Sequence, residues 1–142
     1  MLKLLYSGQE VKSKAMNIGL ALLRIVAGLS MAFGHGLGKM PPSEGFIDGV
    51  GKMGFPLPAV FAWAAGSSEF IGGLLLALGL FTRPSAFFLT ATMAVAAFIR
   101  HADDPFSGKE KALLFMVIFI FLLISGSGKF GIDNLFRKKG LR

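Results

Sequence analysis

The sequence contains no cysteine and few charged residues, and each shortage excludes a class of protein. Without cysteine the chain has no disulfide, thiolate nucleophile, iron–sulfur cluster or cysteine-based zinc site. Charged residues make up 16% of its 142 residues, against about 25% in an average soluble protein. Hydrophobic residues make up 54% of the chain, and this figure does not include the 19 glycines. A soluble domain of this size cannot bury so many apolar residues beneath a polar surface. The composition therefore predicts a single-domain integral membrane protein.

Four apolar stretches predict an all-α fold, a polytopic membrane four-helix bundle. We expect the helices at about residues 17–37, 57–79, 84–101 and 107–125. A membrane-spanning helix needs about 20 apolar residues. The two shorter stretches reach this length because Pro84 suits the first turn of a helix, and Ser107 with Glu110 has the form of a capping box. Residues 1–16 are then an N-terminal segment, 17–136 the bundle and 137–142 a basic tail.

The connections between these helices differ in character. Thr82 and Arg83 alone join the second and third helices, which predicts an antiparallel pair. The first connection is longer, and Ser43 opens a segment with apolar residues at helical spacing, namely Phe46, Ile47, Val50 and Met53. Two interpretations stay open for it, a short helix lying in the membrane interface and an ordinary loop. After the fourth helix, the glycines of residues 126–131 predict a helix cap followed by a turn.

The net charge of +7 indicates orientation rather than nucleic-acid binding, because the latter requires a basic face on a soluble body. In the four-helix arrangement, one side carries nine basic and two acidic residues, and the other side carries five of each. Positively charged loops stay in the cytoplasm, so both termini are predicted to be cytoplasmic and the protein to lie in the inner (plasma) membrane. The partners expected from the sequence are the lipid bilayer, further copies of the chain or other redox proteins, and no nucleic acid.

Arg24 and Glu69 are the two charged residues expected inside the membrane. Arg24 lies about 10 Å from the inner end of the first helix and Glu69 about 15 Å from the inner end of the second, at a rise of about 1.5 Å per residue. A charge near the bilayer centre is costly, so the similar depths predict an Arg24–Glu69 ion pair. Two interpretations of the pair remain, a structural bond that sets helix register and a site for a proton or ligand.

Small residues indicate which helix faces point into the bundle. Residues 24, 28, 32 and 36 form one such stripe and residues 65, 69 and 73 another, so both charged side chains are expected to point inward. His35 follows Arg24 by three helical turns, which places it with Lys39 at the outer mouth, and His101 ends the third helix at the same level.

These polar residues are candidates for different roles. A haem held by His35 and His101 is disfavoured against two hydrogen-bonded interfacial histidines, and no set of ligands sufficient for a metal is present. The histidines could also serve as acids or as the lips of an outer pocket. Trp63 is interpreted as a membrane-interface anchor, with ligand stacking as the alternative. The candidates for catalysis are Arg24, Glu69 and His35, and those for ligand binding are Arg24, His35, Lys39, Trp63, Glu69 and His101.

Several short motifs, in this order and spacing, resemble the DoxX family of four-helix membrane proteins. They are LRI (residues 23–25), HGLGK (35–39), GFPLP (54–58), Glu69 with GG (72–73) and LG (78–79), KEKALLF (109–115) and GSGKFGIDN (126–134). The resemblance covers residues 18–136, and Arg24, His35, Lys39 and Glu69 match its polar positions. It implies membrane redox chemistry, because the family includes a membrane subunit of thiosulfate:quinone oxidoreductase and proteins linked to quinone tolerance.

Three functions are compatible with these observations. The first is a subunit of a redox complex that binds a quinone or similar small ligand next to Arg24 and Glu69, with no catalytic activity alone. The second is a non-catalytic scaffold for partner oxidoreductases. The third is a small-solute or proton transporter, which four helices without an evident inverted repeat would build only as an oligomer.

Overall fold

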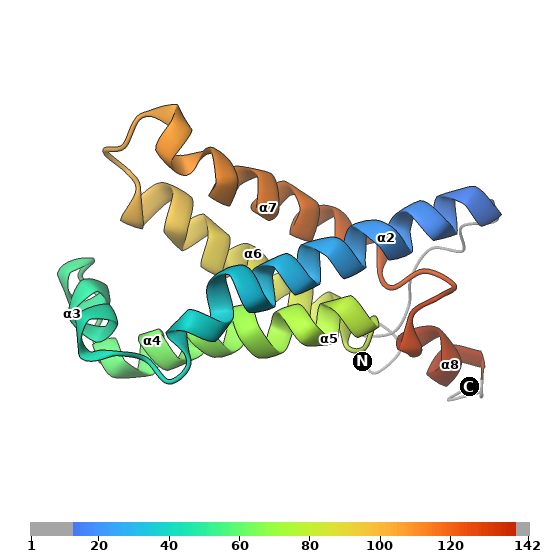
Figure 1. The fold of residues 1–142 in the computed structure, drawn as a ribbon, viewed down its shortest axis with the longest axis horizontal. Helices are drawn as coiled ribbons and strands as arrows, with labels where there is room; N and C mark the ends of the chain where they lie inside the picture. Colours follow the sequence, from blue (N-terminus) through green and yellow to red (C-terminus); the bar gives the residue numbers. More distant parts are fainter. Residues whose placement is uncertain (1–12, 139–142) are drawn as a thin grey trace.

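The computed structural model describes residues 13–138, and this part of the chain is helical with no strand (Figure 1). Its first rod is α2 (Lys14–Met31), which continues through a π-helical turn (Ala32–Gly36) and a 3₁₀ turn (Leu37–Lys39). A short helix, α3 (Glu44–Lys52), follows. The second rod consists of α4 (Pro58–Ser67), a π turn (Ser68–Gly72) and α5 (Gly73–Leu78). The third consists of α6 (Thr82–Val95) and a π turn (Ala96–Arg100), and α7 (Phe106–Ser125) and α8 (Ile132–Lys138) complete the chain.

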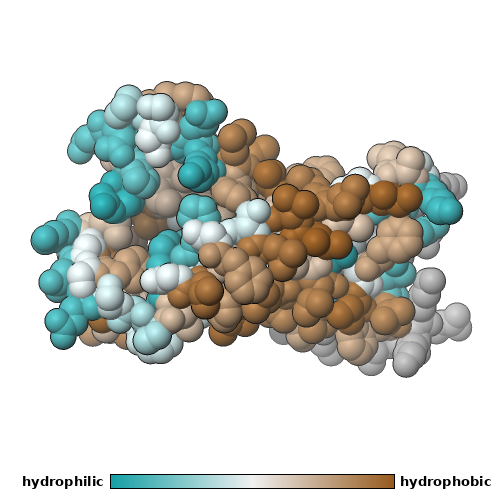
Figure 2. Space-filling model, viewed as in Figure 1, coloured by the Kyte–Doolittle hydropathy of each residue, from teal (hydrophilic) through white to brown (hydrophobic). Residues whose placement is uncertain are grey.

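Three of these rods are long and apolar enough to cross a membrane: Lys14–Lys39, Pro58–Leu78 and Thr82–Arg100. Helix α7 has 20 residues, a length of about 30 Å, but three charged residues lie in its first two turns. Farther along α7, Val117 and Ile124 are more than half exposed, as are Val26 on α2 and Phe87 on α6. Figure 2 shows such apolar residues around the middle of the molecule and hydrophilic residues over the end that carries α3. Such a distribution is typical of a protein whose middle part is surrounded by lipid.

The rods pack through the small residues that the sequence singled out. A Cβ atom added to Gly28 on α2 would lie 2.5 Å from the carbonyl oxygen of Gly73, and one added to Gly73 would lie 2.7 Å from the carbonyl oxygen of Gly28. Neither glycine accepts a side chain, which allows α2 and α5 to pack backbone to backbone. The fully buried Met31, Leu76 and Phe119 belong to the core beside this contact.

The beginning of α2, the turn between α5 and α6, and the segment after α7 meet at one end of the molecule (Figure 1). The backbone N–H of Lys129 donates to the side chain of Asn17 (2.9 Å). Asp133 accepts from the backbone N–H groups of Phe81 (2.8 Å) and Thr82 (2.9 Å), and its own N–H donates to the carbonyl of Gly79 (2.8 Å). Because Phe81, the residue before α6, offers no side-chain cap, Asp133 caps that helix from 51 residues away.

The structure decides four local expectations. Residues 44–52 form the short helix rather than a loop, and Pro84 lies in the first turn of α6. The capping box predicted at Ser107 is wrong, since α7 begins at Phe106 after Pro105 and no side chain caps it. The turn predicted after residue 126 omitted α8, whose Asp133 makes the cap described above. The expected N-terminal segment lies outside the described residues except for its last four positions, and so do the last four residues of the basic tail.

Candidate functional site: a pocket beside the Lys39–Glu69 ion pair

Arg24 is buried at the end of the molecule where the chain ends meet, and it binds backbone rather than a carboxylate. Its guanidinium donates to the carbonyls of Leu76 (3.1 Å) and Ala77 (2.7 Å) from one nitrogen and of Phe130 (3.4 Å) from the other. The first two carbonyls lie in the last turn of α5, where the helix dipole favours a cation, and the Leu76 carbonyl also accepts from the backbone N–H of Gly79 (3.0 Å). Arg24 therefore joins the end of α5 to the segment that follows α7.

The predicted Arg24–Glu69 ion pair is wrong, because Glu69 pairs with Lys39 instead. Side chains of an α-helix lean toward its N-terminus. Helix α2 and the α4–α5 rod run in opposite directions, so the Arg24 side chain leans toward one end of the bundle and the Glu69 side chain toward the other. The guanidinium of Arg24 and the carboxylate of Glu69 therefore lie apart, although the sequence predicts similar depths for the two residues.

The ion pair that does form is short and largely buried. Lys39 Nζ lies 2.7 Å from both carboxylate oxygens of Glu69, whose side chain is 1% exposed, whereas the Lys39 side chain is 33% exposed. Glu69 lies in a π turn, a feature that often marks functional sites, and Lys39 ends the first rod. The two rods meet closely here, since a Cβ on Gly36 would collide with the backbone of Glu69 and Phe70. The pair thus stabilises a rigid contact between the rods.

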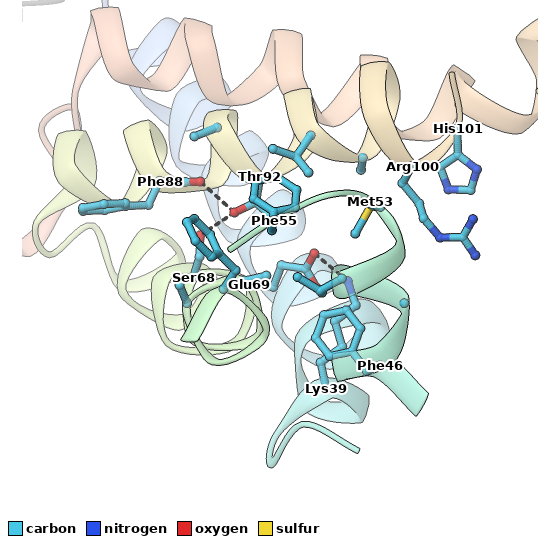
Figure 3. Close-up of a pocket in the computed structure, with 18 of the residues that line it drawn as sticks. Lys39, Phe46, Met53, Phe55, Ser68, Glu69, Phe88, Thr92, Arg100 and His101 are labelled. Atoms are coloured by element: carbon cyan, nitrogen blue, oxygen red, sulfur yellow. Dashed lines mark hydrogen bonds and ion pairs between the residues drawn. The ribbon is translucent and has the colours of Figure 1, made fainter. Parts of the chain in front are cut away.

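A pocket of about 680 Å³ lies beside this ion pair (Figure 3), within the range of about 300–1,000 Å³ usual for small-molecule sites. Helix α3 forms one wall through the face that includes Gly45, Phe46 and Gly49, and α4 and α6 form the others. Most of the lining is apolar, with the aromatic rings of Phe46, Phe55, Phe61 and Phe88. The polar side chains are those of Lys39, Ser68, Glu69, Thr92, Arg100 and His101. Its width depends in part on α3, because a Cβ added to Gly45 or Gly49 would meet nothing within 4 Å.

The structure brings three of the predicted ligand-binding residues to this pocket, Lys39, Glu69 and His101, and places Arg24, His35 and Trp63 outside its lining. His35 packs edge-on against Phe115 of α7, with ring centroids 5.9 Å apart. His101 bonds Asp104 through Nδ1 at 2.6 Å. The two histidines therefore face different neighbours. Trp63 is 48% exposed on α4, as a residue at the membrane interface would be.

Other pocket residues escaped the sequence analysis. Thr92 and Ser68 lie one on α6 and one in the π turn after α4, and their hydroxyl oxygens are 3.2 Å apart. Serine and threonine within an apolar helix usually bond their own backbone and so stand out little. Arg100, at the end of the third rod, was counted only among the charges on one side of the membrane. The sequence contains one sign of the pocket wall, the helical spacing of Phe46, Val50 and Met53. These three residues line the pocket.

Comparison with known proteins identifies the family. The model of the DoxX family matches residues 19–102, which include Lys39, Glu69 and all the other residues that line the pocket. The chain belongs to the DoxX family. It is therefore a membrane protein of that family, as the resemblance of its motifs predicted.

Full-length relatives support this membership. An "Uncharacterized protein" of Haemophilus influenzae is 39% identical over 84% of this chain and 92% of its own length. A Bacillus subtilis protein named "Putative oxidoreductase CatD" is 34% identical over 85% of this chain and 89% of its own. "Inner membrane protein YqjF" of Escherichia coli is 30% identical over 89% of this DoxX chain and 98% of its own. No solved structure matches the chain.

Proposed function

We propose that this DoxX protein is a membrane subunit of a redox system and binds a quinone in the pocket beside Lys39 and Glu69. The observation that carries the proposal is the pocket's composition, an apolar and aromatic chamber with one partly buried ammonium group. A quinone presents a flat apolar ring and carbonyl acceptors, and it suits such a site. The name of the Bacillus subtilis relative supports a redox role, and that of the Escherichia coli relative supports an inner-membrane location.

The Lys39 ammonium supplies the hydrogen bond that a quinone carbonyl needs. A lysine ammonium carries three N–H groups, and the two oxygens of Glu69 account for two of them. The third is free to donate to a ligand in the pocket. Glu69 holds the ammonium in place and balances its charge, and the pair can exchange a proton with a ligand that is reduced or oxidised. The electrons come from a partner redox protein, so the chain has no activity alone.

The proposal includes the arrangement in the membrane. Helix α7 is the fourth spanning helix, with Lys109 and Lys111 reaching the headgroups from its first turns. Both chain ends lie in the cytoplasm, because the end of the bundle that carries Lys14, Arg83 and Lys129 has the excess of positive charge. The pocket then lies at the outer side of the bilayer, within reach of lipid-dissolved quinone.

Occupancy of the pocket is tested with the full chain and decylubiquinone. The protein in detergent is incubated with this quinone, and the bound fraction is measured by native mass spectrometry. Gly49→Leu extends a side chain into the pocket, where a Cβ has open space, and leaves the ion pair untouched. Gly19→Leu is the matched control, since Gly19 is an exposed helical glycine on α2 with nothing within 4 Å.

We expect wild type and Gly19→Leu to retain the quinone and Gly49→Leu to lose at least nine-tenths of it. The proposal is overturned if wild type retains no quinone, or if the two variants retain it equally.

A further inference from the structure

Two hydroxyl groups lie in the pocket away from the ion pair. Thr92 Oγ1 is 3.2 Å from Ser68 Oγ and 2.9 Å from the carbonyl oxygen of Phe88 in the preceding turn of α6. Ser68 and Thr92 both line the pocket (Figure 3). The pair therefore connects the second and third rods inside the proposed binding site.

Counting the protons of this pair shows that it can donate to a ligand. The Thr92 hydroxyl has one proton and two acceptors within reach, Phe88 O and Ser68 Oγ. When Thr92 donates to Phe88, Ser68 donates to Thr92 and the pair is satisfied internally. When Thr92 donates to Ser68 instead, the Ser68 proton is released toward the pocket. The second arrangement keeps the bond between the hydroxyls, so rotation of two hydroxyl groups is enough to present a donor.

The pocket then offers two donors at different points of its wall. Figure 3 shows Ser68 with Thr92 on one side of the pocket and Lys39 with Glu69 on another. Ser68 and Glu69 are consecutive residues of the π turn, so their side chains leave the rod in different directions. A ligand held by both donors needs acceptors in two directions.

We propose that Ser68 determines which ligand the pocket accepts, by donating to a second carbonyl opposite the one bound by Lys39. This deepens the proposed function, on which it rests. The ligand class it names is a ring with two opposed carbonyls, and a ring with a single carbonyl binds through Lys39 alone, because the charged donor makes the stronger hydrogen bond. A purely structural pair of hydroxyls would join the helices and make no distinction between such ligands.

The test compares menadione, a naphthoquinone with two opposed carbonyls, with 2-methyl-tetralone, which has one. Dissociation constants are measured by calorimetric titration of the full chain in detergent. We expect Ser68→Ala to weaken menadione binding about 5- to 10-fold, as the loss of one hydrogen bond does, and tetralone binding less than twofold. Ser67→Ala is the matched control, because Ser67 lies outside the pocket lining and its hydroxyl contacts Met40 Sδ at 3.9 Å.

A second variant separates ligand binding from helix packing. Thr92→Val removes the internal acceptor of Ser68 and leaves the Ser68 proton available, so menadione affinity is expected to stay within twofold of wild type. If the hydroxyls only join helices, Ser68→Ala and Thr92→Val lower the melting temperature alike and change the two affinities by the same factor. That result overturns the inference while quinone binding stands. Failure of wild type to bind menadione at all overturns the proposed function and the inference with it.

Discussion

Replacing Lys39 by methionine should destabilise the protein more than replacing its partner, Glu69, by glutamine. The Glu69 side chain is 1% exposed and accepts both of its short hydrogen bonds from Lys39. Lys39→Met therefore leaves a buried carboxylate without a counter-charge, a change that costs about 3–5 kcal/mol. Glu69→Gln leaves the lysine, whose side chain is 33% exposed and extends to water or headgroups. Its cost is that of a lost charged hydrogen bond, about 1.5–3 kcal/mol.

The double variant tests whether the buried charge is the cause. Lys39→Met combined with Glu69→Gln removes both charges, so it should be more stable than Lys39→Met alone, by about 1–2 kcal/mol. The free energy of unfolding is obtained from a reversible titration with sodium dodecyl sulfate, followed by far-ultraviolet circular dichroism. Lys52→Met serves as the control, since Lys52 is an exposed lysine on α3 outside the pocket lining.

The reasoning would be refuted by either of two results. One is a Lys39→Met protein as stable as Lys52→Met, which would mean that Glu69 needs no counter-charge. The other is a double variant less stable than Lys39→Met, which would mean that the lost contacts outweigh the unpaired charge.

Three further predictions concern the opposite end of the bundle. Arg24→Met should lower the free energy of unfolding by about 2–3 kcal/mol, because three carbonyls lose a charged donor, yet leave decylubiquinone occupancy unchanged; reduced occupancy in a folded variant would contradict it. Asp133→Asn keeps one acceptor for the two N–H groups that start α6, so it should lower the free energy of unfolding by about 1 kcal/mol and speed amide exchange at Phe81 or Thr82. Unchanged amide exchange at both residues would contradict this prediction. Gly79→Ala should cost more than about 1 kcal/mol, because Gly79 has φ +69° and its Cβ would collide with Arg24; a melting temperature equal to that of Gly19→Ala, where space is open, would exclude this cause.

The sequence was sufficient for properties that repeat along a helix. The stripe through Gly28 and the one through Gly73 predicted the inward faces, and the two glycines do meet. The segment from Ser43 was predicted correctly as one of two alternatives, because an N-cap followed by apolar residues at helical spacing is a local signal. The periodicity of small and apolar residues depends only on the helix itself, so the buried face that it predicts does not depend on distant contacts.

Contacts between distant residues were beyond such reasoning. The partner of Glu69 depended on the direction in which a side chain leans, and counting residues from helix ends ignored that direction. Asp133 caps α6, which begins 51 residues earlier, and a local sequence pattern cannot predict a cap from so far along the chain. Ser68 and Thr92 became a pair only because α6 packs beside the π turn, so their joint presence in the pocket could not be read from either segment.

Arg24 and Lys39 lie at opposite ends of the bundle and have different partners. Arg24 uses both of its terminal nitrogens on carbonyls of the chain, and those carbonyls come from the end of α5 and from the segment after α7. A ligand could therefore enter this end only by breaking these hydrogen bonds. Lys39 pairs directly with a single carboxylate beside an apolar pocket, and the two carboxylate oxygens account for two of its three N–H groups. A charge is costly in lipid and is retained only where it contributes to the fold or to binding. Arg24 joins segments far apart in the sequence, whereas Lys39 and Glu69 line the pocket in which we propose that a ligand binds.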